Sequence, residues 1–216
     1  MEEIYALGIG YTSPVFIELA QDAGYTIKAL YHFNGERTGE EIHGFKIIGS
    51  FDDLFSSNIR NKEFLLTMGD MQIRKQLSEK IISLGGIVPS IIHPSAIVSR
   101  YATVSQNGVL IAPYCLVQAD AVLGDGVVMR DSALVCHTTK VDSYTFIGPK
   151  ALVGAKMHLG EGVFVGQQAL LVSGKVKDVG INAIVGAGAV ATKSVDDYSI
   201  IVGNPAKSIG AHQDNK

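Results

Sequence analysis

A repeat of six residues dominates the second half of this 216-residue chain. Eleven consecutive units run from Ile111 to Val176 without a change of register, and each begins with an aliphatic residue or methionine. A period of six with apolar first residues is typical of a parallel β-helix. A helical stripe or a strict alternation cannot keep this register for so long. The first residues of the units are Ile111, Val117, Leu123, Met129, Val135, Val141, Ile147, Val153, Leu159, Val165 and Leu171.

Small side chains form a second pattern within the repeat. The residue four positions after each first residue is small in most units, and Met157 and Lys175 depart from this rule. We expect the first residue to point into a triangular prism and its partner to fill the narrow space near a corner. Three units make a coil of about eighteen residues, and coils stack about 4.8 Å apart. A β-sandwich, the alternative, would show turn signals every 8–12 residues or so and no fixed register.

The register extends beyond these units, with faults. Ile92, Val98 and Val104 begin three earlier units, with one extra residue before Ile111. After Leu171, the pair Lys177-Asp178 adds two residues, and the period resumes at Val179 and Val185. Such faults are usually bulges or small loops. The prism is therefore predicted over roughly residues 91–196.

The first ninety residues follow a different pattern, in which apolar strands alternate with helices. Such alternation predicts a small parallel sheet. With the boundary drawn near Val88-Pro89, the chain divides into domains of residues 1–90 and 91–216. The expected strands are Ile4–Leu7, Thr26–Tyr31 and Phe64–Thr67, and the expected helices are Pro14–Ala23 and Met71–Leu84.

A glycine turn joins the first strand to the first helix. Gly8-Ile9-Gly10 lies just before Ser13, which we expect to cap the helix, and Pro14 suits the first helical position. Backbone N–H groups at such a turn can hold a phosphate. The third glycine of the dinucleotide-binding fingerprint is absent, so the turn alone leaves phosphate binding and a purely structural role both open.

Composition narrows the class of protein. A formal net charge of −3 and a pI near 6.0 give no basic patch, so nucleic acid is not an expected partner. There is no run of about eighteen apolar residues and no charged segment followed by an apolar one at the N-terminus, so neither a membrane span nor export is expected. We interpret Cys115 and Cys136 as reduced, structural residues of a cytoplasmic protein.

Three motifs carry a resemblance to one enzyme family. Gly203-Asn-Pro-Ala-Lys207 matches the ending of hexapeptide-repeat acyltransferases, and Val185-Gly-Ala-Gly-Ala-Val190 resembles their last full coil. Ala133-Leu-Val-Cys-His137-Thr138 resembles their segment S-x-V-x-H-E. With its N-terminal α/β domain, the chain resembles the group that acetylates nucleotide-linked amino sugars, together with the sialic-acid O-acetyltransferases. The resemblance implies a Rossmann-like nucleotide-sugar-binding domain followed by a left-handed parallel β-helix with a C-terminal tail.

The resemblance also implies a mechanism and an assembly. Acetyl-CoA would bind between neighbouring prisms of a homotrimer, without a metal, and His137 would act as the general base. An imidazole suits proton removal near neutral pH. Ala155 follows His137 by eighteen residues, one coil further along the same edge, where its N–H could hold the thioester oxygen. The residues expected to contact acetyl-CoA are Gly154, Ala155, Gln167, Ala187, Lys193 and Pro205.

The acceptor site is expected in the first domain, and here the chain departs from the family. Thr138 replaces the glutamate that usually follows the base, which leaves Asp120 and Asp131 as candidate acids. Phe146 stands where relatives carry a second histidine. Arg74 is either a phosphate ligand or a solvated helix residue. The expected substrate-binding residues are Gly8, Gly10, Tyr11, Thr12, Ser13, His32, Asn34, Gly69 and Arg74.

The remaining histidines do not point to a metal enzyme. His93 is interpreted as structural and His158 as a packing or surface residue, while a γ-type carbonic anhydrase would need three convergent histidines. The predicted function is acetyl-CoA-dependent N-acetylation of the 4-amino group of a nucleotide-linked amino-deoxy sugar for a surface glycan. The alternatives are O-acetylation of a sialic-type sugar and a non-catalytic sugar-nucleotide-binding protein.

Overall fold

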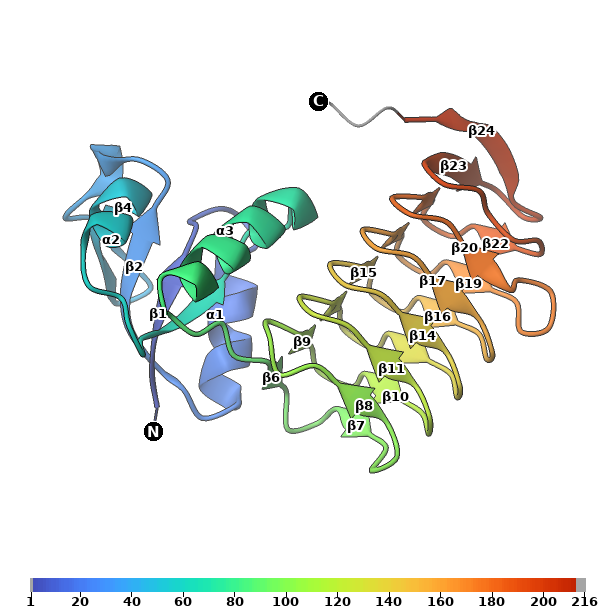
Figure 1. Ribbon diagram of the computed structural model, residues 1–216, viewed down its shortest axis with the longest axis horizontal. Coiled ribbons are helices and arrows are strands. Elements are labelled where there is room, and N and C mark those ends of the chain that lie inside the picture. Colours follow the sequence, from blue (N-terminus) through green and yellow to red (C-terminus); the bar gives the residue numbers. More distant parts are fainter. Residues whose placement is uncertain (1, 213–216) are drawn as a thin grey trace. The chain divides into compact units, whose positions relative to one another are not determined.

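The computed structural model describes residues 2–212, so Met1 and the end of the predicted C-terminal tail, 213–216, lie outside the described residues. The chain forms two compact units (Figure 1). The first is Met1–Pro94 together with Gln106–Gly108, and the second is Ser95–Ser105 together with Val109–Lys216. Within residues 2–212, none of the helices has the length and apolar character needed to cross a membrane.

The first unit contains a five-stranded sheet of order β3-β4-β2-β1-β5. Strands β4, β2, β1 and β5 are parallel, and β3 pairs antiparallel with β4. The parallel strands therefore end at one edge of the sheet. The elements are β1 (Glu3–Leu7), α1 (Ser13–Asp22), β2 (Thr26–His32), the short 3₁₀ helix η1 (Gly35–Arg37), β3 (Glu41–Ile42), β4 (Phe45–Ser50), α2 (Phe51–Ser56), β5 (Glu63–Leu66) and α3 (Met71–Ser83).

Sequence reasoning found three of these strands and two of the helices, with ends displaced by one residue or so. It missed the β3–β4 hairpin and α2, although both have local signals. His43 and Gly44 both adopt positive φ, at 49° and 81°, as a two-residue hairpin turn requires. Ser50 and Asp53 form a capping box at the start of α2.

The prediction that Ser13 caps α1 is wrong. Thr12 occupies the cap position, and Ser13 is already helical. Ser13 is 4% exposed, because its hydroxyl bridges the glycine turn and Thr67, the residue after β5. Pro14 lies in the first helical turn as expected.

The second unit is a prism of short parallel strands in three sheets, which confirms the β-helix prediction. Each strand pairs with the strand one coil away, as Val135 pairs with Val153 eighteen residues later. The leucine face consists of β7 (Ile97–Val98), β10 (Leu116–Val117), β13 (Leu134–Val135), β16 (Leu152–Val153), β19 (Leu170–Leu171) and β22 (Val190–Ala191). The charged face consists of β8 (Thr103–Val104), β11 (Val122–Leu123), β14 (Lys140–Val141), β17 (His158–Leu159) and β20 (Asp178–Val179).

The aromatic face completes the prism and carries its C-terminal hairpin. It consists of β9 (Leu110–Ile111), β12 (Val128–Met129), β15 (Phe146–Ile147), β18 (Phe164–Val165), β21 (Ile184–Val185), β23 (Ser199–Val202) and β24 (Lys207–Ala211). The strand order of this sheet ends at the short strand β6 (Ile91–Ile92), next to β9. Strands β23 and β24 are antiparallel, and Gly203–Ala206 with a cis Asn204–Pro205 bond joins them.

Burial follows the predicted register. Every first residue from Ile111 to Leu171 is at most 1% exposed, and the partner four positions later is buried in all units but the last. In that unit Lys175 is exposed and Val176 fills the core position instead. Of the two extra residues, one therefore lies in the turn before Val176 and the other between Val176 and β20, which begins at Asp178.

The first predicted unit keeps its register but is less buried. Ile92 takes the second place in β6, as the first residues of the other units do in their strands, yet it is 38% exposed. β6 is the last strand in the order of its sheet, so no further coil covers Ile92. Ile91 takes the outward place, as Leu110 and Val128 do, and is buried like them. The prism core includes the partly buried Val98 and Val104 and extends to Ile201.

Candidate functional site

The strands of the prism are joined by tight turns that stack into three edges. The His137 edge joins the leucine face to the charged face and contains the turns at 118–120, 136–138, 154–156, 172–175 and 192–194. The Gln167 edge joins the aromatic face to the leucine face and contains the turns at 113–114, 131–132, 149–150, 167–168 and 187–188. Turn residues such as Thr138 and Lys156 adopt a φ near 59°, which lets the chain bend sharply at the corner from one face to the next.

His137 is exposed at the turn after β13, and its backbone and ring are both held. The His137 N–H donates to Gln118 Oε1 at 2.9 Å. The ring Nδ1 lies 3.2 Å from Thr138 Oγ1. When Nδ1–H donates to this hydroxyl, the lone pair of Nε2 is available to accept a proton. The geometry therefore suits a general base.

One coil further on, Ala155 occupies the matching turn. Strand β13 pairs with β16 in an eighteen-residue register, so Ala155 follows His137 along the edge by one strand spacing, about 4.8 Å. The Lys156 N–H donates to the His137 carbonyl oxygen at 3.2 Å, which links the two turns directly. The Ala155 N–H donates to Ser173 Oγ at 2.8 Å. This N–H thus points at a position where an oxygen atom is accommodated.

Gly154 is small for a reason that sequence reasoning did not identify. A Cβ at this position would lie 2.5 Å from the Leu171 carbonyl oxygen and 2.7 Å from the Ser173 backbone nitrogen. The contact with the next coil therefore requires glycine here, independently of any ligand.

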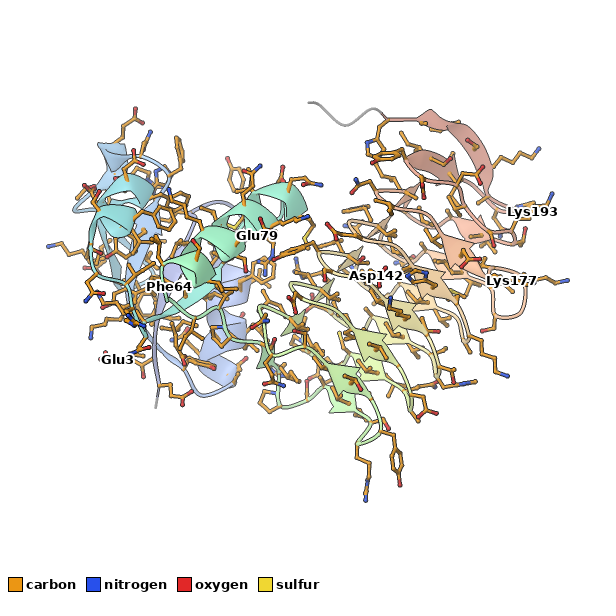
Figure 2. The ribbon with its side chains drawn as sticks, in the orientation of Figure 1. Glu3, Phe64, Glu79, Asp142, Lys177 and Lys193 are labelled. Carbon is orange, nitrogen blue, oxygen red and sulfur yellow. The ribbon has the colours of Figure 1, made fainter. Side chains whose placement is uncertain are left out.

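The other residues predicted to contact the acyl donor fall in two places. Gln167 and Ala187 lie on adjacent coils of the Gln167 edge, away from the His137 edge of the same prism. Lys193 and Pro205 line a pocket of about 410 Å³ at the C-terminal end of the prism, where Figure 2 labels Lys193. Lys207, which was not predicted, lines the same pocket.

The structure also shows where the candidate acids Asp120 and Asp131 lie, and what Phe146 contacts in place of the expected histidine. Asp120 lies on the His137 edge one coil before the base, whereas Asp131 lies on the Gln167 edge beside Arg130, at 3.4 Å. Asp131 is therefore wrongly placed to orient His137 within one chain. Phe146 stacks on Phe164 across the aromatic face with ring centroids 4.9 Å apart. It is thus a packing residue of that face.

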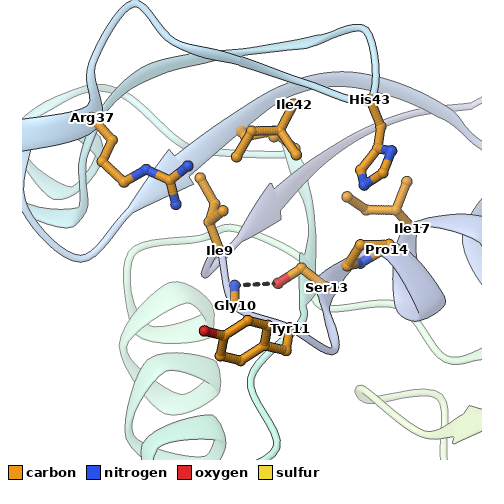
Figure 3. Close-up of a pocket in the computed structure, with 10 residues that line it drawn as sticks. Ile9, Gly10, Tyr11, Ser13, Pro14, Ile17, Arg37, Ile42 and His43 are labelled. Carbon is orange, nitrogen blue, oxygen red and sulfur yellow. Dashed lines mark hydrogen bonds between the residues drawn. The ribbon is translucent and has the colours of Figure 1, made fainter.

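A pocket of about 520 Å³ lies at the carboxyl edge of the sheet in the first unit (Figure 3). Gly10, Tyr11 and Ser13 line it, as predicted residues of the acceptor site. Figure 3 shows Arg37 and His43 across the pocket from Gly10 and Tyr11. Sequence reasoning missed both, because they belong to η1 and the hairpin turn that it did not detect.

Hydroxyl groups of Thr12, Ser13 and Thr67 hold the glycine turn through hydrogen bonds. Ser13 Oγ accepts from the Gly10 N–H at 2.8 Å and lies 2.8 Å from Thr67 Oγ1. Thr67 Oγ1 donates to the Gly8 carbonyl oxygen at 2.5 Å, and Thr12 Oγ1 donates to the Thr67 carbonyl oxygen at 3.3 Å. Gly8 has a φ of 91°. These bonds fix the glycine turn, of which Gly10 lines the pocket, whereas Gly8 and Thr12 do not line it.

Other predicted acceptor residues lie at the ends of neighbouring strands. His32 is buried at the end of β2, and its Nδ1 lies 3.0 Å from Asn34 Oδ1. The same Asn34 oxygen accepts from the Glu36 N–H and caps η1. Gly69 is exposed after β5. His32 and Asn34 therefore support the loop that presents Arg37, and neither lines the pocket itself.

Both interpretations of Arg74 are wrong. Its side chain is 2% exposed, and it donates to the carbonyl oxygens of Leu66 and Gly108. The guanidinium also lies over the Phe16 ring, 6.0 Å from the ring centroid. Arg74 is a structural residue inside the first unit, neither a phosphate ligand nor a solvated one.

Three further titratable groups of the prism have shifted pKa values. Burial raises the pKa of the Cys115 thiol to about 11, and burial also raises the pKa of Cys136. Partial burial raises the pKa of the Asp142 carboxyl, but hydrogen bonds from Lys140 and His158 outweigh it and leave the pKa below its ordinary value. Over residues 2–212, no three side chains of His, Cys, Asp or Glu gather as metal ligands.

Similar proteins were found among solved structures. GDP-perosamine N-acetyltransferase from Caulobacter crescentus, as a histidine-to-alanine mutant in complex with CoA and GDP-perosamine, is 26% identical with a TM-score of 0.89, over 97% of this chain and 98% of that chain. The acetyltransferase domain of PglB from Neisseria gonorrhoeae, in complex with acetyl coenzyme A, is 31% identical with a TM-score of 0.86, over 96% and 99%. No family model matches the chain.

Curated relatives match shorter segments. GDP-perosamine N-acetyltransferase from Escherichia coli O157:H7 is 25% identical over 147 residues, which span 68% of this chain and 65% of that protein. The acyl-[acyl-carrier-protein]–UDP-N-acetylglucosamine O-acyltransferase of Mesorhizobium japonicum is 40% identical over 60 residues, 28% of this chain and 21% of that protein. The chain thus spans less than two thirds of the length of both curated relatives.

The prism and its full-length match define the class: a hexapeptide-repeat protein with a left-handed parallel β-helix. Within that class, the chain belongs to the family of hexapeptide-repeat acetyltransferases that contains the nucleotide-amino-sugar N-acetyltransferases. This confirms the resemblance seen in the hexapeptides and in the Gly203–Lys207 motif.

Proposed function

We propose that the protein transfers the acetyl group of acetyl-CoA to the 4-amino group of a nucleotide-linked amino-deoxy sugar destined for a surface glycan. The observation that carries the proposal is the stacking of His137 and the Ala155 N–H on successive coils of one edge. Two relatives support the choice of ligands, because one is solved with CoA and GDP-perosamine and the other with acetyl coenzyme A.

The reaction follows from these two groups. The neutral amine attacks the thioester carbonyl carbon while His137 Nε2 accepts its proton. The carbonyl oxygen becomes an oxyanion and accepts a hydrogen bond from the Ala155 N–H. This bond replaces the one that the Ala155 N–H donates to Ser173 Oγ in the free protein. The carbon–sulfur bond then breaks, and the imidazolium returns the proton to the CoA sulfur. The Thr138 hydroxyl orients the ring but carries no charge to stabilise the imidazolium.

The pocket at the end of the prism contains two lysines and one aspartate, Asp196, and its excess of positive charge suits the phosphates of CoA. Lys193 and Lys207 line it together with Pro205, and Ser194 and Ser208 add hydroxyl groups. Lys193 also lies on the His137 edge. We therefore assign the nucleotide end of CoA to this pocket and the thioester to the Ala155 turn, so that the chain of the coenzyme runs along the edge.

A homotrimer is part of the proposal, and the outer faces support it. The leucine face carries an outward ladder of aliphatic side chains, and the aromatic face carries Phe146, Phe164 and Ile184, whereas the charged face carries Lys140, His158 and Asp178. The two apolar faces meet at the Gln167 edge. If the leucine face and the aromatic face are buried between prisms, Gln167 and Ala187 of one subunit come near the His137 edge of another. The ladder residues are Ile97, Leu116, Leu134, Leu152, Leu170 and Val190.

We assign the first unit to the acceptor as a Rossmann-like nucleotide-sugar-binding domain, residues 1–90, and the prism of 91–216 to acetyl-CoA. Parallel strands, a glycine turn and a helix N-terminus beside the pocket support this assignment. Arg37 supplies a positive charge for the diphosphate. A cytoplasmic location completes the proposal and fits the free state of Cys115 and Cys136.

The test is a thiol-release assay with acetyl-CoA against UDP-, dTDP- and GDP-linked 4-amino sugars, their 4-hydroxy counterparts and free sialic acid. We expect turnover with one amino sugar and its loss in His137→Ala. Turnover only with hydroxyl acceptors would replace the proposal by O-acetylation. Silence across the panel, with sugar-nucleotide binding retained in calorimetry, would favour a non-catalytic binding protein.

A further inference from the structure

A buried hydroxyl lies directly behind the turn that carries Ala155. Thr139 is 1% exposed, and its Oγ1 donates to the Gly154 carbonyl oxygen at 2.7 Å. This carbonyl belongs to the same peptide group as the Ala155 N–H. Thr139 therefore contacts, from the core, the peptide whose N–H is proposed to hold the oxyanion.

The contacts form a continuous chain through one peptide group. The Thr139 hydroxyl donates to the Gly154 oxygen, and the nitrogen of that peptide, Ala155 N, donates to Ser173 Oγ at 2.8 Å. Hydrogen bonds in such a chain polarise one another, by about 10–30% per bond. A donor on the carbonyl side increases the positive charge on the N–H, which is the property that an oxyanion site needs.

The same hydroxyl also fixes the orientation of the peptide. The Met157 N–H donates to Thr139 Oγ1 at 3.5 Å, and Gly154 is packed against Leu171 and Ser173 of the next coil. The peptide plane is thus held from the core and from the following coil. His137 lies two residues before Thr139 in the same hexapeptide, so one repeat unit supplies both the base and the support of the oxyanion donor.

We propose that Thr139 is a positioning residue for acyl transfer, acting through the Gly154–Ala155 peptide. This inference rests on the proposed acetyltransferase function. It predicts that loss of the hydroxyl weakens stabilisation of the transition state while leaving substrate binding intact, because the oxyanion charge develops only during the reaction.

The chain offers a matched control six residues later. Thr145 is 0% exposed, occupies the same position in its hexapeptide and donates to the Gly160 carbonyl oxygen at 3.1 Å. Gly160 also packs tightly against the next coil. Its turn belongs to a different edge of the prism, so Thr145 has the same structural role without the connection to His137 and Ala155.

Replacement by valine is tolerated at these positions by the repeat itself. Val127 and Val163 fill the equivalent place in two other units and are 0% exposed, and Ala133 and Ala151 do so in two more. At similar volume, Thr139→Val therefore removes the bond to the Gly154 oxygen and the long 3.5 Å bond from the Met157 N–H, and Thr145→Val removes the bond to the Gly160 oxygen. Thr139→Ser restores the hydroxyl, and Thr139→Ala provides a second deletion if the valine variant does not fold.

The experiment measures kcat, both KM values and the thermal midpoint for the wild type and these four variants. We expect Thr139→Val to lower kcat about three- to thirtyfold, the range for weakening one hydrogen bond in a transition state, with KM for acetyl-CoA within about twofold. Thr139→Ser should recover most of the rate. Thr145→Val should lower the thermal midpoint about as much as Thr139→Val does, while its kcat stays unchanged. Equal kcat values for the two valine variants, or a serine variant as slow as the valine one, would overturn the inference. A wild type without turnover would instead refute the acetyltransferase function, and the inference with it.

Discussion

The two units of this protein use their residues in opposite ways. In the prism, each turn residue has counterparts one coil before and after it, so a functional residue is visible as a departure from the ladder. His137 lies between Ala119 and Ala155 in this stacking, which leaves room on both sides of the imidazole. In the α/β unit no position is repeated, and a residue acquires its role from contacts with distant parts of the chain.

Arg74 and Arg37 show what this difference means. Both are arginines near the carboxyl edge of one sheet, yet Arg74 is buried and bonded to two carbonyl groups, whereas Arg37 lines the pocket and pairs with Glu40 at 2.8 Å. Nothing local in the sequence separates the two. In the prism, the place of a residue in the repeat therefore indicates its function. In the α/β unit, the burial and tertiary contacts of the side chain do so.

The largest expected effect tests the prism side of this comparison. We expect His137→Ala to lower kcat by about 10² to 10⁴, the usual contribution of a general base, with an unchanged thermal midpoint because the side chain is exposed. The matched control is His158→Ala on the charged face, where the ring Nε2 contacts Asp142 at 2.7 Å. Comparable losses in both variants would show that stacking on the His137 edge does not identify the base.

The prism could be predicted from the sequence because one geometric rule governs many residues at once. The buried first residues, the coil of eighteen and the pairing of the His137 and Ala155 turns all follow from that period. The failures lie where the rule ends. Ile92 lies in the last strand of its sheet and is 38% exposed, and an extra turn residue moves the core position from Lys175 to Val176.

The α/β unit was predicted only as alternating strands and helices. The β3–β4 hairpin was missed although His43-Gly44 is a recognisable turn, and Arg37 and His43 were lost from the site with it. Ser13 was expected to be a helix cap, but its hydroxyl bonds to Thr67, fifty-four residues away. Such contacts depend on the tertiary arrangement, which no local pattern contains.

The next effect separates the two arginines. We expect Arg37→Met to raise KM for the nucleotide sugar about tenfold to a hundredfold, since hydrogen bonds to charged groups contribute roughly 1.5–3 kcal/mol. Arg74→Met should leave KM unchanged and lower the free energy of unfolding by about 1–3 kcal/mol, because the carbonyl groups of Leu66 and Gly108 lose their donor. Steady-state kinetics and urea unfolding measure both. A KM change in Arg74→Met that matches the one in Arg37→Met would remove the distinction.

A smaller effect compares glycines in the two units. Gly154→Ala should lower the free energy of unfolding by about 1–3 kcal/mol, the usual cost of overpacking, because its Cβ would meet the Leu171 oxygen at 2.5 Å. Gly35→Ala is the control, since its nearest neighbour would be Thr38 Oγ1 at 4.0 Å, and a change within about 0.5 kcal/mol is expected. Equal stabilities in chemical denaturation would mean that adjacent coils can separate to admit a methyl group.

The smallest expected effect concerns the charged face. Because the pKa of Asp142 is lowered in the folded protein, its carboxylate stabilises the fold above the unfolded pKa of about 3.9, and this contribution is lost as pH falls through the lower folded value. Asp142→Asn should therefore lower the thermal midpoint at pH 7, with a cost of at most about 1 kcal/mol for a partly exposed ion pair. The difference should begin to shrink below about pH 4 and vanish only below the lower folded pKa. Calorimetry of both proteins between pH 3 and 7 measures this, with added salt reducing the gap at neutral pH. A difference that is constant with pH would assign the residue to packing, and the charged face would then be held, like the rest of the prism, by its apolar register alone.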